Sequence, residues 1–174
     1  LNTNLLEKNN ITFNTEEWIY QPGVPDNAAI IESDAFTRVE KVLQAFVETN
    51  TIDASITSTW TPQEWVHFVR NFPEDITLEQ LQQLDDTFYF TDSTNSYISM
   101  VWYEQSIIKG YHGNKVDFKI SEFLNTVGRR WYVTTLFKAF KKTDRIEEAL
   151  TIYKTARPNY HSVTSNTIDE LLGL

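Results

Sequence analysis

Residues 61–72, TPQEWVHFVRNF, start with the sequence features that begin an α-helix. Thr61 stands where its hydroxyl can accept a hydrogen bond from the first turn, and Pro62 fits the first helical position, which needs no N–H donor. Glu64 lies where it completes a capping box with Thr61. The stretch therefore predicts a helix whose starting point is fixed by the sequence.

The segment at residues 77–88, TLEQLQQLDDTF, repeats this device with Thr77 and Gln80. Short polar connections join it to its neighbours, and such connections place successive helices antiparallel and side by side. In several other stretches, apolar residues recur with the spacing of an amphipathic helix. These further predicted helices cover residues 33–49, 114–128, 129–142 and 143–157.

Residues 92–109, DSTNSYISMVWYEQSIIK, are open to two interpretations. Their aromatic and β-branched side chains would suit strands, whereas their length and cap-rich start favour a buried helix. With this segment counted as a helix, about seven successive helices and no pair of strands are predicted. The chain is therefore predicted to be all-α, either a helical bundle or a superhelix of helix pairs.

Charge is distributed unevenly along the chain. The net charge is -9, yet residues 109–157 hold 11 basic and 5 acidic residues, while residues 1–108 hold 4 basic and 17 acidic residues. A cationic second half could meet an anionic partner or the acidic surface of a neighbouring domain. Nucleic acid is not expected as a partner, because the overall field repels phosphate and no recognition motif is present. A membrane is not expected either, because no apolar run has the length of a membrane span.

The sequence offers no self-sufficient catalytic centre. It has no cysteine, and its three histidines, His67, His112 and His161, do not form the His-Glu-x-x-His pair of a zinc site. We interpret His67 as a half-buried structural residue, His112 as a solvated loop residue and His161 as support for a helix cap. No catalytic residue and no metal ligand is assigned to this chain. Three acidic pairs are interpreted as solvated groups, near helix starts or exposed: Glu16–Glu17, Glu74–Asp75 and Asp85–Asp86.

The main candidate for a binding site is TVGRRWYVTTLFKAFKK, residues 126–142. Gly128 is predicted to end one helix in the left-handed conformation, so that Arg129 falls at the junction with the next helix. The planar guanidinium of Arg129 matches a carboxylate through two parallel hydrogen bonds. Alternatively, Arg129 and Arg130 pair with local acids or cap helix-end carbonyls, and the residues alone favour this second interpretation.

Four stretches, taken together and in order, resemble the C-terminal helical domain of the leukotriene A4 hydrolase family of zinc aminopeptidases. The resemblance extends from about residue 17 to the end of the chain. Its most specific parts are the Trp-Ile-Tyr-x-Pro-Gly-Val-Pro opening, the Gly-Arg junction and the closing His-x-Val-Thr. Bacterial aminopeptidases of this family are the expected relatives. The compartment is not fixed by these features, and we favour the cytoplasm over the periplasm. The four stretches are EEWIYQPGVP at 16–25, SYISMVWYEQSIIKGY at 96–111, VGRRWYVTTLFKAF at 127–140 and ARPNYHSVTSNTIDELL at 156–172.

The resemblance implies an all-α, armadillo-like superhelix of antiparallel helix pairs over residues 28–174, with residues 1–27 as a connector from a catalytic domain. Since the only methionine is Met100, the chain is expected to be part of a longer polypeptide. The resemblance places the zinc ion and the catalytic motif in that other, thermolysin-like domain. This chain would then be the non-catalytic C-terminal domain of a zinc aminopeptidase, inactive alone, which closes the active-site cleft. The alternative is a stand-alone helical scaffold that binds a protein or peptide partner.

For the Gly-Arg junction, the resemblance implies that Arg129 binds the free C-terminal carboxylate of a short peptide substrate. In the family a lysine two positions further along assists this arginine, whereas Trp131 stands there in this sequence. Arg130, or a cation from another domain, is expected to compensate. The change to Trp131 also argues against hydrolysis of a lipid epoxide. With the resemblance added, a binding role for Arg129 is favoured over local pairing.

Overall fold

The computed structural model describes residues 15–25, 28 and 33–174. The chain falls into two units, residues 1–33 and residues 34–174. Every regular element among the described residues is helical. The prediction of an all-α chain is therefore confirmed.

The first unit contains one described helix, α2, which covers Thr15–Tyr20. Residues 15–20, which lie within the predicted connector over residues 1–27, are therefore helical. Glu16 and Glu17 lie in the first turn of α2, where carboxylates favour a helix. Pro22 then disfavours the helical conformation for the residue before it, so the helix stops. The remainder of the predicted connector falls partly outside the described residues, which leave out residues 1–14 and 26–27.

The second unit contains all seven helices that the sequence predicts, and one more at its end. Each predicted segment is helical over most of its length, including the ambiguous stretch at 92–109. Two short 3-10 turns are also present, Phe90–Asp92 and Arg157–Asn159. The helices are α3 (Ala35–Thr49), α4 (Pro62–Arg70), α5 (Leu78–Phe88), α6 (Ser96–Lys109), α7 (Asn114–Thr126), α8 (Arg130–Lys142), α9 (Ile146–Ala156) and α10 (Ser162–Leu172).

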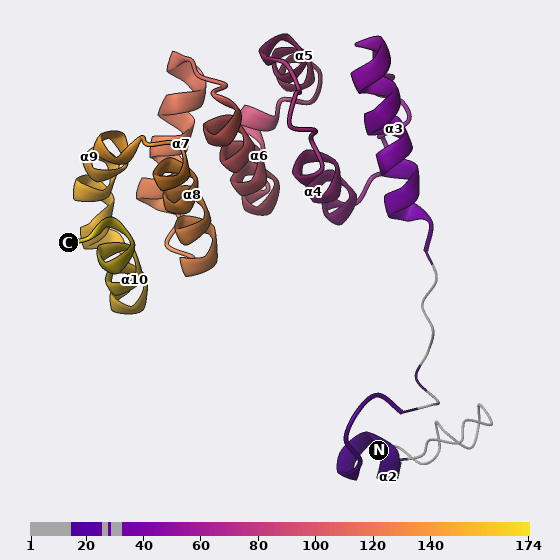
Figure 1. Ribbon diagram of the computed structural model, residues 1–174, viewed down its shortest axis with the longest axis horizontal. Helices are drawn as coiled ribbons and strands as arrows, with labels where there is room; N and C mark the ends of the chain where they lie inside the picture. The colour runs from indigo at the N-terminus through magenta and orange to yellow at the C-terminus, as the bar shows by residue number, and fades with distance from the viewer. Residues whose placement is uncertain (1–14, 26–27, 29–32) are drawn as a thin grey trace. The chain divides into compact units, whose positions relative to one another are not determined.

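The helices of the second unit form two rows. Helix α6 packs between α4 and α8, and α8 packs in turn against α10. Helices α7 and α9 pack against each other. Figure 1 shows them with α5 as a second row beside the row of α4, α6, α8 and α10. Chain order therefore alternates between the rows from α4 onward, as expected when short connections join antiparallel helices. Because of this order, the starts of α6, α8 and α10 lie on the same side of the unit.

The helix starts predicted from the sequence are present. The Thr61 hydroxyl accepts a hydrogen bond from Glu64 N at 3.3 Å, and Glu64 Oε2 accepts one from Thr61 N at 2.8 Å. Thr77 and Gln80 make the same reciprocal pair at the start of α5. In each pair, two backbone N–H groups that have no acceptor within the helix gain a side-chain acceptor. Both capping boxes are therefore confirmed.

Helix α6 is buried on most of its circumference because it has neighbours on both sides in its row. Its central residue Trp102 has no exposed surface and contacts the rings of Phe72, Phe90 and Tyr111. The ring centroids of Trp102 and Phe90 lie 5.1 Å apart in a stacked arrangement. Burial on all sides explains why the stretch lacks a clear helical stripe and could be confused with a strand.

Asp85 has a structural role that its interpretation as a solvated acid missed. It lies near the end of α5, where its Oδ1 accepts from Thr91 N at 2.8 Å and its Oδ2 accepts from the Thr91 hydroxyl at 2.6 Å. Tyr111 Oη donates to the same carboxylate at 3.2 Å. The Thr91 hydroxyl in turn accepts from Trp102 Nε1 at 2.9 Å. The carboxylate thereby links α5 to the 3-10 turn, to α6 and to the loop after α6.

Asp169 links the C-terminal helix α10 to the residues before it through hydrogen bonds and an ion pair. Its carboxylate accepts from Tyr153 Oη at 2.6 Å and from Arg157 through Nε at 2.9 Å and Nη2 at 2.7 Å. The hydrogen bond from Arg157, followed by that from Tyr153, lowers the pKa of Asp169 to about 2. These contacts join α10 to the end of α9.

We expect Asp169→Asn to lower the thermal unfolding midpoint at neutral pH and to lose most of this effect in acid. An unpaired aspartate has a pKa of about 4 in the unfolded chain. A folded-state pKa of about 2 therefore stabilises the fold above about pH 4, and this contribution disappears as the pH falls through about 2. Thermal scans of both proteins between pH 7 and pH 2 should show the two midpoints converging. A difference that is independent of pH would contradict the role of the ionised carboxylate.

Candidate functional site

Helices α7 and α8 meet at a short junction of extended backbone. Helix α7 ends at Thr126, Val127 is extended at φ -103° and ψ 110°, and Arg129 is the N-cap of α8 at φ -67° and ψ 111°. Gly128 is not among the glycines with positive φ, so the predicted left-handed conformation is wrong. The extended residues on both sides turn the chain without it. Arg129 nevertheless stands between the two helices, as predicted.

The Arg129 guanidinium lies on the two aromatic rings that follow it in the sequence. Its Cζ is 4.7 Å from the Tyr132 ring centroid and 5.7 Å from the Trp131 ring centroid. Its Nη1 donates to Tyr132 Oη at 3.1 Å. Stacking and one hydrogen bond orient the planar group while leaving most of its donors open. The side chain is therefore held in place without being neutralised.

The two rings belong to a cluster that joins α8 to α6. We call Tyr97, Trp131 and Tyr132 the ring cluster. The Tyr97 ring centroid lies 5.2 Å from that of Trp131 and 6.0 Å from that of Tyr132, and the Trp131 and Tyr132 centroids are 5.4 Å apart. Arg70, the last residue of α4, lies 5.5 Å from the Tyr97 centroid and 5.9 Å from the Trp131 centroid. Two arginines from different helices thus contact one ring cluster.

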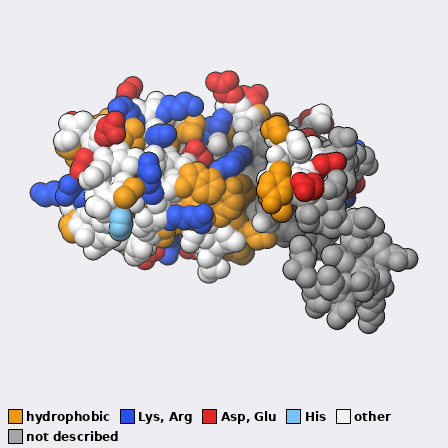
Figure 2. Space-filling model, turned by 90° about the horizontal axis from the view of Figure 1, so that it is seen from below, with side chains coloured by type: hydrophobic (Ala, Val, Ile, Leu, Met, Phe, Trp, Pro, Cys, Tyr) orange, Lys and Arg blue, Asp and Glu red, His pale blue; other side chains and the backbone are white. Residues whose placement is uncertain are grey.

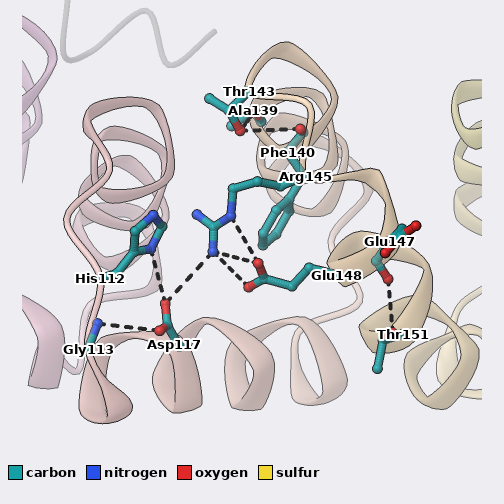
Figure 3. A network of polar contacts seen from close by, with 10 residues as sticks. All are labelled: His112, Gly113, Asp117, Ala139, Phe140, Thr143, Arg145, Glu147, Glu148 and Thr151. Carbon is teal, nitrogen blue, oxygen red and sulfur yellow. Dashed lines mark hydrogen bonds and ion pairs between the residues drawn. The ribbon is translucent and has the colours of Figure 1, made fainter.

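The arginines of this chain divide into two kinds. In Figure 3, Arg145 donates to Glu148 at 2.6–2.9 Å and lies 3.9 Å from Asp117, which His112 Nδ1 approaches to 3.5 Å. The charge of Arg145 is therefore compensated, and its contacts join the start of α9 to α7. Among the described residues, by contrast, no carboxylate forms an ion pair with Arg70, Arg129 or Arg130. The pairing of Arg129 and Arg130 with local acids is therefore not seen in the described part of the chain.

Two hollows adjoin the ring cluster. An open groove of about 840 Å³ between α8 and α10 is lined by Arg129, Arg130 and Trp131, and it continues along the lysines of α8 toward Glu170. A smaller hollow of about 240 Å³ is lined by Arg70 and Tyr97 together with α3 and α4 side chains. Figure 2 shows Lys and Arg side chains gathered around hydrophobic side chains on one face. Since the Tyr97 and Trp131 rings touch, the ring cluster lies between the groove and the hollow.

The histidines have structural partners. His67 is half-buried, shares a 2.8 Å hydrogen bond between its Nε2 and Glu40 Oε1, and stacks on Phe36 at 4.2 Å, which confirms a structural role. His161 Nδ1 accepts from Val163 N at 3.2 Å, which confirms the predicted cap of α10. His112 is exposed but approaches Asp117, so it is not simply solvated. In the described part of the chain, no group of three or more His, Asp or Glu side chains could hold a metal ion. No described helix is long and apolar enough to cross a membrane.

The sequence did not reveal Arg70 and Tyr97 as members of the site. Arg70 ends the helix that starts at Thr61, and Tyr97 lies in the first turn of α6. Both lie far in sequence from Arg129, and the stretches that contain them gave no sign of a binding role. Only the packing of α4, α6 and α8 in one row brings them together.

Comparison with known proteins gives consistent matches. Residues 60–172 match the family described as leukotriene A4 hydrolase, C-terminal. The chain is 30% identical to leucine aminopeptidase 2 of Chaetomium globosum over 127 residues, and this match covers 69% of the chain and 20% of the relative. For leucine aminopeptidase 2 of Neurospora crassa the identity is 28% over 124 residues, covering 67% and 18%. For leucine aminopeptidase 2-1 of Scheffersomyces stipitis it is 25% over 178 residues, covering 94% and 28%. These three relatives are fungal, and the expected bacterial relatives are not among them.

The fold also has a solved counterpart. The structure of native yeast leukotriene A4 hydrolase aligns with a TM-score of 0.70 and 19% identity, covering 93% of this chain and 29% of that chain. At this identity the likeness concerns the fold alone. The chain therefore spans less than a third of the length of the relatives it matches. Because the family match covers more than half of the chain and a relative is 30% identical over more than two thirds of it, the chain belongs to the leukotriene A4 hydrolase C-terminal domain family.

Proposed function

We propose that this chain is the C-terminal domain of a zinc-dependent aminopeptidase and that Arg129 binds the free C-terminal carboxylate of a short peptide substrate. One observation carries the proposal. The Arg129 guanidinium is exposed at a helix junction, is oriented by Tyr132 and has no carboxylate partner among the described residues. A cation that is held in place but not neutralised is suited to an anionic ligand. The aminopeptidase activity named for the fungal relatives supports the choice of a peptide as that ligand.

In this proposal the partner of the domain is a thermolysin-like catalytic domain of the same polypeptide. Residues 1–27 connect the two domains, and residues 28–174 close one side of the active-site cleft. The residues that the structure describes offer no cluster of metal ligands, so they do not fit a zinc site. In this proposal the zinc ion and the groups that cleave the peptide belong to the catalytic domain. No reaction step is assigned to side chains of the present chain.

The contribution of Arg129 to catalysis would be positioning. A carboxylate held at one end of a short peptide fixes how far the other end extends toward the reacting groups. Binding energy from this remote contact can thereby orient the scissile bond and limit the length of accepted peptides. A stand-alone scaffold would have no such requirement, because its ligand would only need to bind.

The test uses the full-length polypeptide with a tripeptide and its C-terminal amide. We expect the free acid to be cleaved with a kcat/KM higher by at least about ten-fold, because amidation removes the charge that Arg129 contacts. Equal rates for the two peptides would contradict the anchoring role. Absence of peptidase activity from the full-length polypeptide would favour the scaffold alternative.

A further inference from the structure

We propose that Arg70 binds a second carboxylate, so that the site prefers short peptides whose C-terminal residue is itself acidic. In this arrangement Arg129 holds the backbone carboxylate of the last residue and Arg70 holds its side-chain carboxylate. The inference rests on the proposed function, since it assumes that a peptide C-terminus reaches Arg129. It adds a substrate class that follows from a second cation.

Three of the six arginines are available for a ligand. All six arginines of the chain lie within the described residues, and three of them pair with Asp or Glu. The pairs use Arg38, Arg145 and Arg157. The other three, Arg70, Arg129 and Arg130, form no ion pair with a described carboxylate. Two of these three converge on the ring cluster although they come from different helices.

The two guanidinium groups lie at different places on the ring cluster. Both contact the Trp131 ring, Arg70 at 5.9 Å and Arg129 at 5.7 Å from its centroid. Their other ring contacts differ, since Arg70 lies on Tyr97 and Arg129 lies on Tyr132. The two cations thus occupy different edges of the ring cluster, one beside the smaller hollow and one beside the groove. Two cations held at separate positions suit two anionic groups on one small ligand.

A ligand with two carboxylates suits the two cations. A C-terminal glutamate carries two carboxylates joined by a short aliphatic stem. The stem can lie along the border of the ring cluster between the two cations, while each carboxylate accepts two parallel hydrogen bonds from a guanidinium. An arginine already stacked on a ring loses little further freedom when it forms these bonds. A glutamine of the same length would keep the stem contact and lose the charge.

The acids near Arg70 leave its guanidinium available. Glu104 of α6 feels the charge of Arg70 but forms no ion pair with it, and burial raises the pKa of Glu104 more than Arg70 and Lys142 lower it. Glu40 Oε1 shares a 2.8 Å hydrogen bond with Nε2 of His67, a residue that lines the smaller hollow. Neither acid therefore takes the position of a ligand carboxylate.

The experiment compares two tripeptides that differ only in a C-terminal glutamate or glutamine, cleaved by the full-length polypeptide. We expect kcat/KM to favour the glutamate peptide by about ten-fold, and Arg70→Ala to reduce this ratio to about one. Arg70→Lys should keep part of the preference because it retains the charge. Lys154→Ala removes an exposed cation on α9, away from the site, and should leave the ratio unchanged.

The outcomes separate this inference from the proposed function. If Arg129→Ala lowers the rates for both peptides while Arg70→Ala leaves the glutamate preference intact, Arg129 remains an anchor and the role of Arg70 is wrong. If Arg129→Ala has no effect on either peptide, the proposed function itself fails. A glutamate preference that disappears with Arg70→Ala and survives Arg129→Ala at a lower rate supports both. A structural effect of Arg70→Ala would lower both rates together and leave the ratio unchanged, which would also contradict the inference.

Discussion

Replacing Arg129 with alanine in the full-length polypeptide is expected to lower kcat/KM for free tripeptides by about 2–4 kcal/mol of transition-state binding, roughly 30- to 1000-fold. The expected loss is large because the catalytic domain would cover Arg129 and its ligand, so the substrate carboxylate would be left buried without a partner. In the proposed role this contact orients the scissile bond, so its loss should reduce kcat as well as raise KM. Steady-state kinetics with a tripeptide and with its C-terminal amide measure the effect.

The substrate comparison provides the internal control. Amidated peptides and amino-acid anilides lack the carboxylate, so the variant should cleave them at nearly the wild-type rate. Arg129→Lys keeps the charge without the planar fork and should fall between the wild type and Arg129→Ala. Arg130→Ala should cost less, because no ring or hydroxyl among the described residues orients Arg130 in the way that Tyr132 orients Arg129. Equal losses on charged and neutral substrates would show that Arg129 stabilises the domain and does not anchor the substrate.

Local features of the fold could be predicted because they depend on residues close in sequence. Thr61 and Glu64 can form a capping box only within the first helical turn, and the structure contains it. His161 caps α10 through the same kind of short-range contact. The antiparallel order of successive helices was predicted from the short connections. These features need no information about distant parts of the chain.

Other features depend on which helices become neighbours. Asp85 was predicted to be solvated because nothing near it in sequence indicates a partner, yet the turn after α5 brings Thr91 to its carboxylate. Gly128 was predicted to be left-handed because glycine often ends helices this way, but extended residues at the junction already turn the chain. In each case one residue type is compatible with several local structures, and packing selects among them.

The same distinction applies to the candidate site. Arg129 could be identified from the Gly-Arg junction and from the family resemblance, since both are contained in one short stretch. Arg70 and Tyr97 could not, because they join the site only through the contact of α4 and α8 with α6. The sequence also left open whether Arg129 pairs with a local acid. The structure answers this for the described residues, where the nearest specific partner of Arg129 is the Tyr132 hydroxyl.

The largest effect on stability is expected for Trp102→Ala, which should lower the free energy of unfolding by about 3–5 kcal/mol. Trp102 of α6 is fully buried and packs against three aromatic rings. Its removal leaves a cavity in the core around α6. The Thr91 hydroxyl, which donates to Asp85, also loses the hydrogen bond that it accepts from Trp102 Nε1. Urea unfolding followed by circular dichroism measures the change.

A second tryptophan of the same domain, which is half-exposed, provides a matched control. Trp131 is 46% exposed, so Trp131→Ala should change the free energy of unfolding by about 1 kcal/mol or less. Trp102→Phe separates packing from hydrogen bonding, since it keeps most of the ring volume and removes Nε1, and it should cost about 1–3 kcal/mol. If Trp102→Ala and Trp131→Ala were equally destabilising, the burial of Trp102 would not be a main source of the stability of the fold. A large loss for Trp102→Ala and a small one for Trp131→Ala would mean that the fold depends on the buried ring in α6 and not on the half-exposed ring of the candidate site.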